Sequence, residues 1–242
     1  MAEHILYTRK SVFSKPAAPA QAPRPDAVRP VFRLKDPGSA VTHFIGLVLA
    51  VLATPPLLIH AAGRGAGVLQ LASLSVFMLS MAALYAASTA YHSFNLANGR
   101  NRILKKLDHM MIFVLIAGTY TPILLVSVRP LYPVLAWVIF GIQWGLTALA
   151  VALNAVDLKR FRVISMILYI AMGWCIIVAI RPMLVCCGWT AFGWILGGGI
   201  SYTIGAILYG LGRTHRYCHS IFHIFVNLGS LLQAVAILFY IL

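Results

Sequence analysis

Two histidines near the C-terminus have the spacing of a metal-binding pair. The stretch His219-Ser-Ile-Phe-His223 stands at the start of the last long apolar run. Residues four apart lie on one face of a helix, one turn apart, so both imidazoles can reach the same metal ion. The same spacing suits two histidines that contact lipid headgroups at a membrane interface. Spacing alone leaves both interpretations open.

Two further polar clusters lie at the ends of other apolar runs. Ser88 and His92 are spaced by four near the end of the second run, and Asp108 opens the third. An ionisable residue at such a place in a membrane protein is a candidate functional residue. Taken singly, His92 also fits a hydrogen-bonded histidine inside a helix bundle. Asp108 fits a helix cap or a partner of Lys105 or Arg102.

Taken together, the three clusters predict a zinc site. Zinc binds imidazoles tetrahedrally, and a catalytic zinc site uses three protein ligands and keeps its fourth position for water. His92, His219 and His223 are the predicted ligands. A water at such a metal reaches a pKa near ~7 and is a nucleophile at neutral pH. Asp108 would orient that water or take its proton, and Ser88 would hydrogen-bond to the water or to a substrate carbonyl.

The remaining histidines fit other roles. His43 suits a membrane-interface anchor or a partner of a metal ligand, and we prefer the anchor. His109 points about 100° away from Asp108 around a helix, which favours a structural role. His215 falls in a basic loop and should be solvated. Imidazoles also bind iron, nickel or copper, so the ligand type alone does not identify the metal.

The composition is typical of a membrane protein. The 242 residues are 61% hydrophobic and only 10% charged, whereas a soluble domain holds roughly 25% charged residues. The chain has 19 lysines and arginines against 5 acidic residues, a net charge of +14. In so apolar a chain, this excess indicates basic loops that face an anionic membrane leaflet rather than nucleic acid. The four cysteines lack C-x-x-C spacing and predict no disulfide framework.

The predicted fold is an all-α integral membrane protein with one domain. Residues 1–35 form a basic tail rich in proline and alanine, which we expect to be disordered and cytoplasmic. Residues 36–242 should form a seven-helix transmembrane domain, because only helices satisfy their backbone within lipid over such lengths. The predicted spans are 41–61, 69–92, 107–128, 132–153, 162–180, 190–211 and 219–242.

The basic residues predict the orientation of these spans. Sixteen of the 19 lie in the tail and in the second, fourth and sixth connections. The other connections hold only Arg64, Arg129 and Arg181, the last of them in a loop with the neighbouring Cys186 and Cys187. Positive residues stay inside, so we predict a cytoplasmic N-terminus and a C-terminus outside. All three polar clusters then lie at the cytoplasmic end.

Proline and glycine mark three places where the spans should deviate from straight helices. Pro55-Pro56 should bend the first span, and Gly118-Thr-Tyr-Thr-Pro122 should bend the third. Gly197-Gly-Gly199 should let two helices approach closely, as small residues do in membranes.

These motifs resemble those of bacterial hemolysin III proteins, within the progestin and adipoQ receptor superfamily. The resemblance runs from about residue 36 to the C-terminus and rests on Asp36-Pro-Gly-Ser-Ala-Val-Thr-His-Phe-Ile-Gly46, Ser88-Thr-Ala-Tyr-His92, Asp108-His109 with Ala117-Gly-Thr-Tyr-Thr-Pro122, and His219-Ser-Ile-Phe-His223. It implies seven helices, an intracellular N-terminus and zinc held by the three histidines near the cytoplasmic side. It also matches Ser88 and Asp108 to the family's serine and aspartate. Asp36 stands where many members carry a glutamate.

Two functions follow from the site and the resemblance. The first is a zinc-dependent hydrolase of a membrane lipid amide or ester, as alkaline ceramidases and eukaryotic relatives suggest. The second is a non-catalytic regulator or sensor of membrane lipid state, or a haemolysis-associated membrane protein, with structural zinc. We expect the plasma membrane of a bacterium, with a membrane lipid as substrate or ligand, anionic inner-leaflet lipids at the basic loops and no nucleic acid. The oligomeric state is not predicted.

Overall fold

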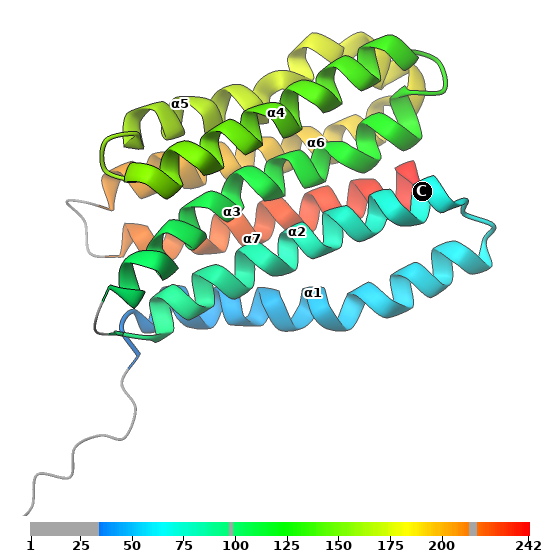
Figure 1. Ribbon diagram of the computed structural model, residues 1–242. Coiled ribbons are helices and arrows are strands. Elements are labelled where there is room, and N and C mark those ends of the chain that lie inside the picture. The colour runs from blue at the N-terminus through cyan, green and yellow to red at the C-terminus, as the bar shows by residue number, and fades with distance from the viewer. Residues whose placement is uncertain (1–33, 97–98, 213–216) are drawn as a thin grey trace, which may run out of the picture. The chain divides into compact units, whose positions relative to one another are not determined.

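The computed structural model is all-helical over the residues it describes, which are 34–96, 99–212 and 217–242 (Figure 1). Nearly all of the predicted tail lies outside these residues, as do Arg213, His215 and Arg216. The long helices are α1 (Pro37–Gly63), α2 (Val68–Ser93), α3 (Arg100–Pro122), α4 (Pro133–Asp157), α5 (Arg162–Gly173), α6 (Ile180–Leu211) and α7 (Cys218–Ala236). Three short helical segments extend them, namely η1 (Ile123–Val128), η2 (Trp174–Ala179) and η3 (Ile237–Ile241).

In the described part of the chain, 6 helical stretches are long and apolar enough to cross a membrane, as judged by length and composition. One of them joins α5, η2 and α6 into a single stretch of 50 residues, Arg162–Leu211. Gly188 interrupts α6 with φ 74° and ψ 173°, a left-handed conformation that glycine adopts without steric cost. The chain is helical up to this glycine, so the predicted loop around Cys186 and Cys187 is wrong. Hydropathy predicts a loop between residues 180 and 190, whereas the structure interrupts the helix only at Gly188.

Helix α3 begins earlier than its apolar run predicts. It starts at Arg100 rather than near residue 107, because lysine and arginine are good helix formers that hydropathy does not count. The Lys106 ammonium donates to the carbonyl of Ala155 near the end of α4 and so ties the first turns of α3 to that helix. Asp108 therefore lies two turns inside α3, and the interpretation of Asp108 as a helix cap is wrong.

Two of the predicted deviations occur at proline. Helix α1 continues through Pro55 and Pro56, and its ribbon curves midway along its length (Figure 1). Helix α3 ends at Pro122, where the chain changes to the π-helical turn η1. Proline has no backbone N–H and clashes with the preceding turn, which accounts for both changes.

Glycines allow two pairs of helices, α2 with α3 and α6 with α7, to pack closely. A Cβ at Gly118 of α3 would lie 2.3 Å from Ser80 Oγ of α2, and one at Gly198 of α6 would lie 2.8 Å from the Gln233 side chain of α7. A Cβ at Gly229 of α7 would likewise lie 2.7 Å from the Tyr202 ring of α6. The close approach predicted for the triple glycine is therefore confirmed at Gly198.

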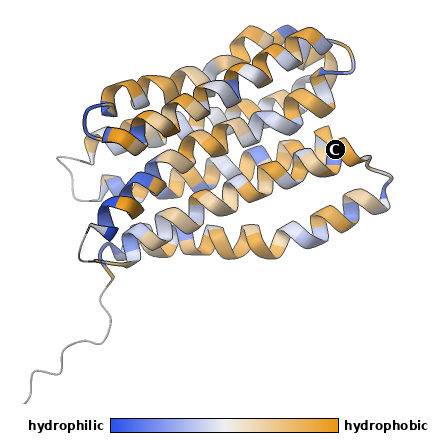
Figure 2. Cartoon of the chain, viewed as in Figure 1, coloured by the Kyte–Doolittle hydropathy of each residue, from blue (hydrophilic) through white to orange (hydrophobic). Residues whose placement is uncertain are grey.

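Polar and apolar residues separate along the bundle. Apolar side chains stay exposed on its outer faces, among them Leu52, Ile59, Val134 and Phe239. Hydrophilic residues gather at one end, around the start of α3 and the connection from α4 to α5 (Figure 2). An apolar perimeter with a polar end is the pattern expected of helices surrounded by lipid.

The close contact at Gly118 predicts that a larger residue at this position destabilises the protein. Replacing Gly118 by alanine should lower the free energy of unfolding of the detergent-purified protein by about 1–3 kcal/mol, because the new methyl group overlaps Ser80. The midpoint of thermal unfolding should fall accordingly. Gly141→Ala in α4 is the matched control, since its Cβ meets nothing within 4 Å. A thermal-unfolding midpoint that falls equally in both variants would contradict this packing.

Candidate metal centre

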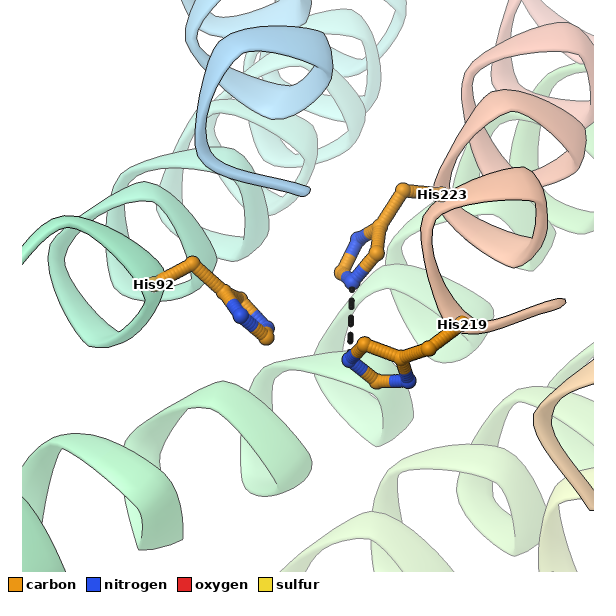
Figure 3. Close-up of side chains that lie close together, drawn as sticks. All are labelled: His92, His219 and His223. Carbon is orange, nitrogen blue, oxygen red and sulfur yellow. Dashed lines mark hydrogen bonds between the residues drawn. The ribbon is translucent and has the colours of Figure 1, made fainter. Parts of the chain in front are cut away.

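Helices α2 and α7 bring three histidine side chains together (Figure 3). One nitrogen each from His92, His219 and His223 lies within 4.8 Å of the other two. The Nε2 atoms of His219 and His223 are 3.4 Å apart. Two ligands bound at 2.0–2.1 Å to one tetrahedral zinc ion are also about 3.4 Å apart. The pair is therefore spaced as two ligands of a single metal ion.

The ring nitrogens of the third histidine accept and donate no hydrogen bond within the part of the chain that the structure describes. His92 is 3% exposed, and among the described residues neither of its ring nitrogens has a hydrogen-bond partner. Its Nδ1 lies 3.3 Å from Asp36 Oδ2, within ion-pair distance but without hydrogen-bond geometry. A buried polar nitrogen without a partner is costly, and a bound cation removes that cost. The three residues therefore fit a metal ion, although their chemistry does not select one metal.

His43 of α1 completes the cluster behind His223. Its ring nitrogens lie 3.0 and 3.1 Å from His223 Nδ1, and its side chain is only 2% exposed. A hydrogen bond at Nδ1 determines that Nε2 is the free nitrogen of His223, and Nε2 is the atom that faces His219. The interpretation of His43 as an interfacial anchor is wrong, because the ring is buried against a predicted ligand.

Asp108 and Ser88 lie beside the histidines. The Asp108 side chain is 15% exposed and lies 3.5 Å from His109 Nδ1. In the described ranges it forms no ion pair with Lys105 or Arg102, so the predicted pairing with these residues is wrong. Ser88 is buried one turn before His92, and its hydroxyl lies near the Asp108 carboxylate without hydrogen-bond geometry. A carboxylate and a hydroxyl are thus available next to the candidate ligands.

The cluster opens into the interior of the bundle. A cavity of about 740 Å³ touches His219, His223 and Asp108 and continues between α3, α5, α6 and α7 as far as Trp174 and Gln233. A second cavity of about 420 Å³ lies beside it. The two share the residues Lys105, Asp108, His109, Arg162, Tyr209 and His219. Most side chains around the larger cavity are apolar, as in sites that hold the hydrocarbon part of a ligand.

Comparison with known proteins identifies the family. The family described as "Haemolysin-III related" matches residues 33–234. The chain is 38% identical to "Hemolysin-3" of Bacillus cereus over 204 residues, which cover 84% of this chain and 90% of that protein. The chain belongs to the haemolysin III family. The "Hemolysin-3 homolog" of Bacillus subtilis (strain 168) is 36% identical over 211 residues, which cover 87% of this chain and 96% of that one. The resemblance seen in the motifs is thus confirmed.

Membership and the six apolar helices together make this haemolysin III protein a multi-pass membrane protein. Its N-terminal residues just before α1 are held against the end of α2. The Asp36 N–H donates to the His92 carbonyl at 2.9 Å, and the Lys35 ammonium donates to the Tyr91 carbonyl at 3.2 Å. The same ammonium lies 3.3 Å from the centre of the Tyr91 ring, in cation–π contact. These contacts hold the Asp36 carboxylate beside His92.

His109 links three helices of this haemolysin III protein. Its Nδ1 lies 2.9 Å from the Lys105 carbonyl and its Nε2 lies 3.2 Å from the Tyr209 hydroxyl of α6. Its backbone carbonyl accepts a hydrogen bond from the Tyr169 hydroxyl of α5. These contacts agree with the structural role expected of His109.

The sequence favours the membrane interface for His43 over a place beside a ligand and predicts no contact for Asp36, whereas the structure places them against His223 and His92. Both lie in the motif before and within α1, but neither has the four-residue spacing that marks His219 and His223. The sequence does place His43 and Asp36 at the same predicted depth as His92, His219 and His223, and this shared depth could have indicated the contacts. Carboxylates and imidazoles beside metal ligands orient them, and their loss typically costs about 10–100-fold in metal affinity.

Replacing His43 by alanine should therefore weaken zinc binding by about 10–100-fold, because His223 loses the partner that orients its ring. A competition titration with a zinc chelator on detergent-purified protein measures this affinity. His60→Ala is the matched control, since His60 is an exposed histidine of the same helix. His43→Gln, which can still hydrogen-bond to His223, should recover part of the affinity. Equal zinc affinity in all four proteins would rule out this role.

Proposed function

We propose that this haemolysin III protein is a zinc-dependent hydrolase that cleaves an amide or ester bond of a membrane lipid. The observation that carries the proposal is the position of the three histidines next to Asp108, at one end of an apolar cavity of about 740 Å³. A lipid can place its acyl chain in such a cavity while its carbonyl group lies among the polar side chains. The polar linkage and the candidate ligands are then at the same depth.

In this proposal His92, His219 and His223 hold the metal ion. A bound zinc ion supplies a Lewis acid that polarises a carbonyl and lowers the pKa of a water molecule to about 7. Asp108 accepts a proton from the attacking water and returns it to the leaving amine or alcohol. Ser88 donates a hydrogen bond to the water or to the carbonyl oxygen of the substrate. One water molecule is consumed, and the products are a carboxylic acid and an amine or alcohol.

We also propose seven spans, with the N-terminus in the cytoplasm and the C-terminus outside. Support comes from Gly188, which divides the stretch Arg162–Leu211 into two helical parts. Each part has more than the roughly 20 residues that a bilayer requires. The described basic residues gather at the end that carries the histidines, which favours that end as the cytoplasmic one. The bacterial plasma membrane is the compartment that fits this family.

A second function, a regulator or sensor of membrane lipid state with structural zinc, is favoured by one observation. Helix α2 packs against α1 and α3, whereas α7 packs against α1 and α6. A metal ion bound to His92, His219 and His223 would join α2 directly to α7. Such a link could serve conformation alone, without any turnover.

Metal content tests both functions. Purified wild-type protein should contain about one zinc ion per chain by mass spectrometry, as expected for three imidazole ligands. His219→Ala/His223→Ala should contain none, and His60→Ala should match the wild type. Folded wild-type protein without bound metal, after purification in the absence of chelators, would exclude the hydrolase and the structural zinc alike.

Turnover separates the enzyme from the sensor. Asp108→Asn should keep its zinc and lose about 10²–10⁴-fold in hydrolysis, because the acid acts on protons rather than on the metal. Release of fatty acid from a panel of lipid amides and esters in vesicles measures the rate. Asp157→Asn is the matched control, since that acid is exposed at the C-terminal end of α4 and lines neither cavity. Wild-type protein that holds zinc but cleaves no lipid of the panel would favour the sensor.

A further inference from the structure

The cavity end next to the histidines is lined by cations. Lys105 and Arg162 each line both cavities, Lys35 lines the smaller one, and Lys159 lines the larger one. Arg162 is half-buried at the first turn of α5. Within the described ranges, neither Lys105 nor Arg162 forms an ion pair with a carboxylate. A half-buried guanidinium without an anionic partner is unusual, because burial without pairing costs free energy.

Neighbouring cations on the same connections are placed differently. The Lys106 ammonium donates to the Ala155 carbonyl, and the Arg160 guanidinium lies over the Phe161 ring at 5.5 Å. Arg102 and Arg160 line neither of the two cavities. The orientation of helices in a membrane depends only on the number of basic residues in each connection, so it does not account for basic side chains that line a cavity. Lys105 and Arg162 are therefore candidates for ligand binding, whereas Arg102 and Arg160 are suitable controls.

The acidic residues nearby leave an excess of positive charge. Asp36 faces His92, and Asp108 faces His109. Lys35 and Lys105 line the same cavity, and burial and the charge of Lys105 lower the pKa of Lys35 although Asp108 and Asp36 act in the opposite direction. A bound divalent metal ion would add to this positive charge. An anion placed between these groups would relieve the repulsion.

We infer that the site selects an acyl lipid whose headgroup carries a negative charge, with Lys105 and Arg162 as the residues that bind that headgroup. The inference rests on the proposed function only in taking the larger cavity as the place of the acyl chain. A guanidinium binds a phosphate or carboxylate through two parallel hydrogen bonds, and an ammonium adds a point charge. The linkage between headgroup and chain then lies beside His219 and Asp108, which border both cavities.

The test is competition between two lipids with the same acyl chains. Full-length protein in detergent receives equal amounts of phosphatidylglycerol and phosphatidylcholine, and native mass spectrometry counts the bound molecules of each. Wild-type protein should prefer phosphatidylglycerol by about tenfold, the ratio that one charge-assisted hydrogen bond supplies. Lys105→Gln/Arg162→Gln should bring the ratio close to one. Arg102→Gln/Arg160→Gln removes the same charge from the same connections and should keep the preference.

Two further measurements keep the result decisive. Lys105→Arg/Arg162→Lys retains both charges and should keep the preference, which separates loss of charge from loss of folding. Inorganic phosphate at millimolar concentration should displace little phosphatidylglycerol, because it has no acyl chain to bury. If inorganic phosphate displaced phosphatidylglycerol when both are at the same concentration, the ligand would be a free phosphate and the lipid assignment would be overturned. An unchanged lipid ratio in Lys105→Gln/Arg162→Gln would overturn the role of the two cations.

Failure of this inference and failure of the proposed function have different signatures. Zinc bound at the histidines without any preference between the two lipids contradicts the headgroup site alone. A preference that depends on Lys105 and Arg162 in a protein without zinc supports the headgroup site and contradicts the hydrolase.

Discussion

The structure depends on the cost of burying imidazole rings in an apolar bundle. His43, His92 and His223 are each at most 3% exposed, and a buried polar group without a partner costs about 1–3 kcal/mol. Each ring is therefore placed where another polar group or a cation can face it. His43 faces His223, and Asp36 faces His92. Of the nitrogens that remain, His223 Nε2 faces His219 Nε2 at 3.4 Å, and a metal ion bound by His92, His219 and His223 would satisfy all three rings.

Helix α1 supplies the outer partners because small residues let it approach α7. A Cβ at Gly38 would lie 2.6 Å from Ser220 Oγ, and one at Gly46 would lie 2.9 Å from Asn227 Oδ1. The Asn227 amide donates to the Thr42 carbonyl at 2.8 Å, between the two glycines. One face of α1 is thus fixed against α7 on both sides of His43. In the proposed metal site, the motif before and within α1 would position His223 without supplying a ligand, so substitutions there would act on a bound metal through the geometry of His223.

The sequence predicts which three histidines come together, but not the contacts that His43 and Asp36 make with them. A four-residue spacing on a helix is a geometric fact that survives folding, so His219 and His223 were identifiable, and depth in the membrane added His92. Depth does not say whether a side chain faces lipid or the bundle, so the sequence does not separate an interfacial His43 from one that is buried beside His223. Hydropathy also predicted most of the spans. It misses the polar first turns of α3, and it predicts a loop of several residues where the helix is interrupted only at Gly188, because neither feature depends on apolar content.

The fourth ligand position distinguishes the two proposed functions. A structural zinc site in proteins is closed by four protein ligands, whereas a catalytic site keeps one position open. A fourth histidine is present in this cluster, yet His43 lies against Nδ1 of His223, on the side away from His219. Asp108 lines the same cavity as His219 and His223, so a metal ion held by the three histidines would have this carboxylate and the cavity beside it. A bundle that needed zinc only to join α2 to α7 would gain from using this fourth histidine as a ligand. Its placement behind His223 therefore favours the hydrolase over the sensor.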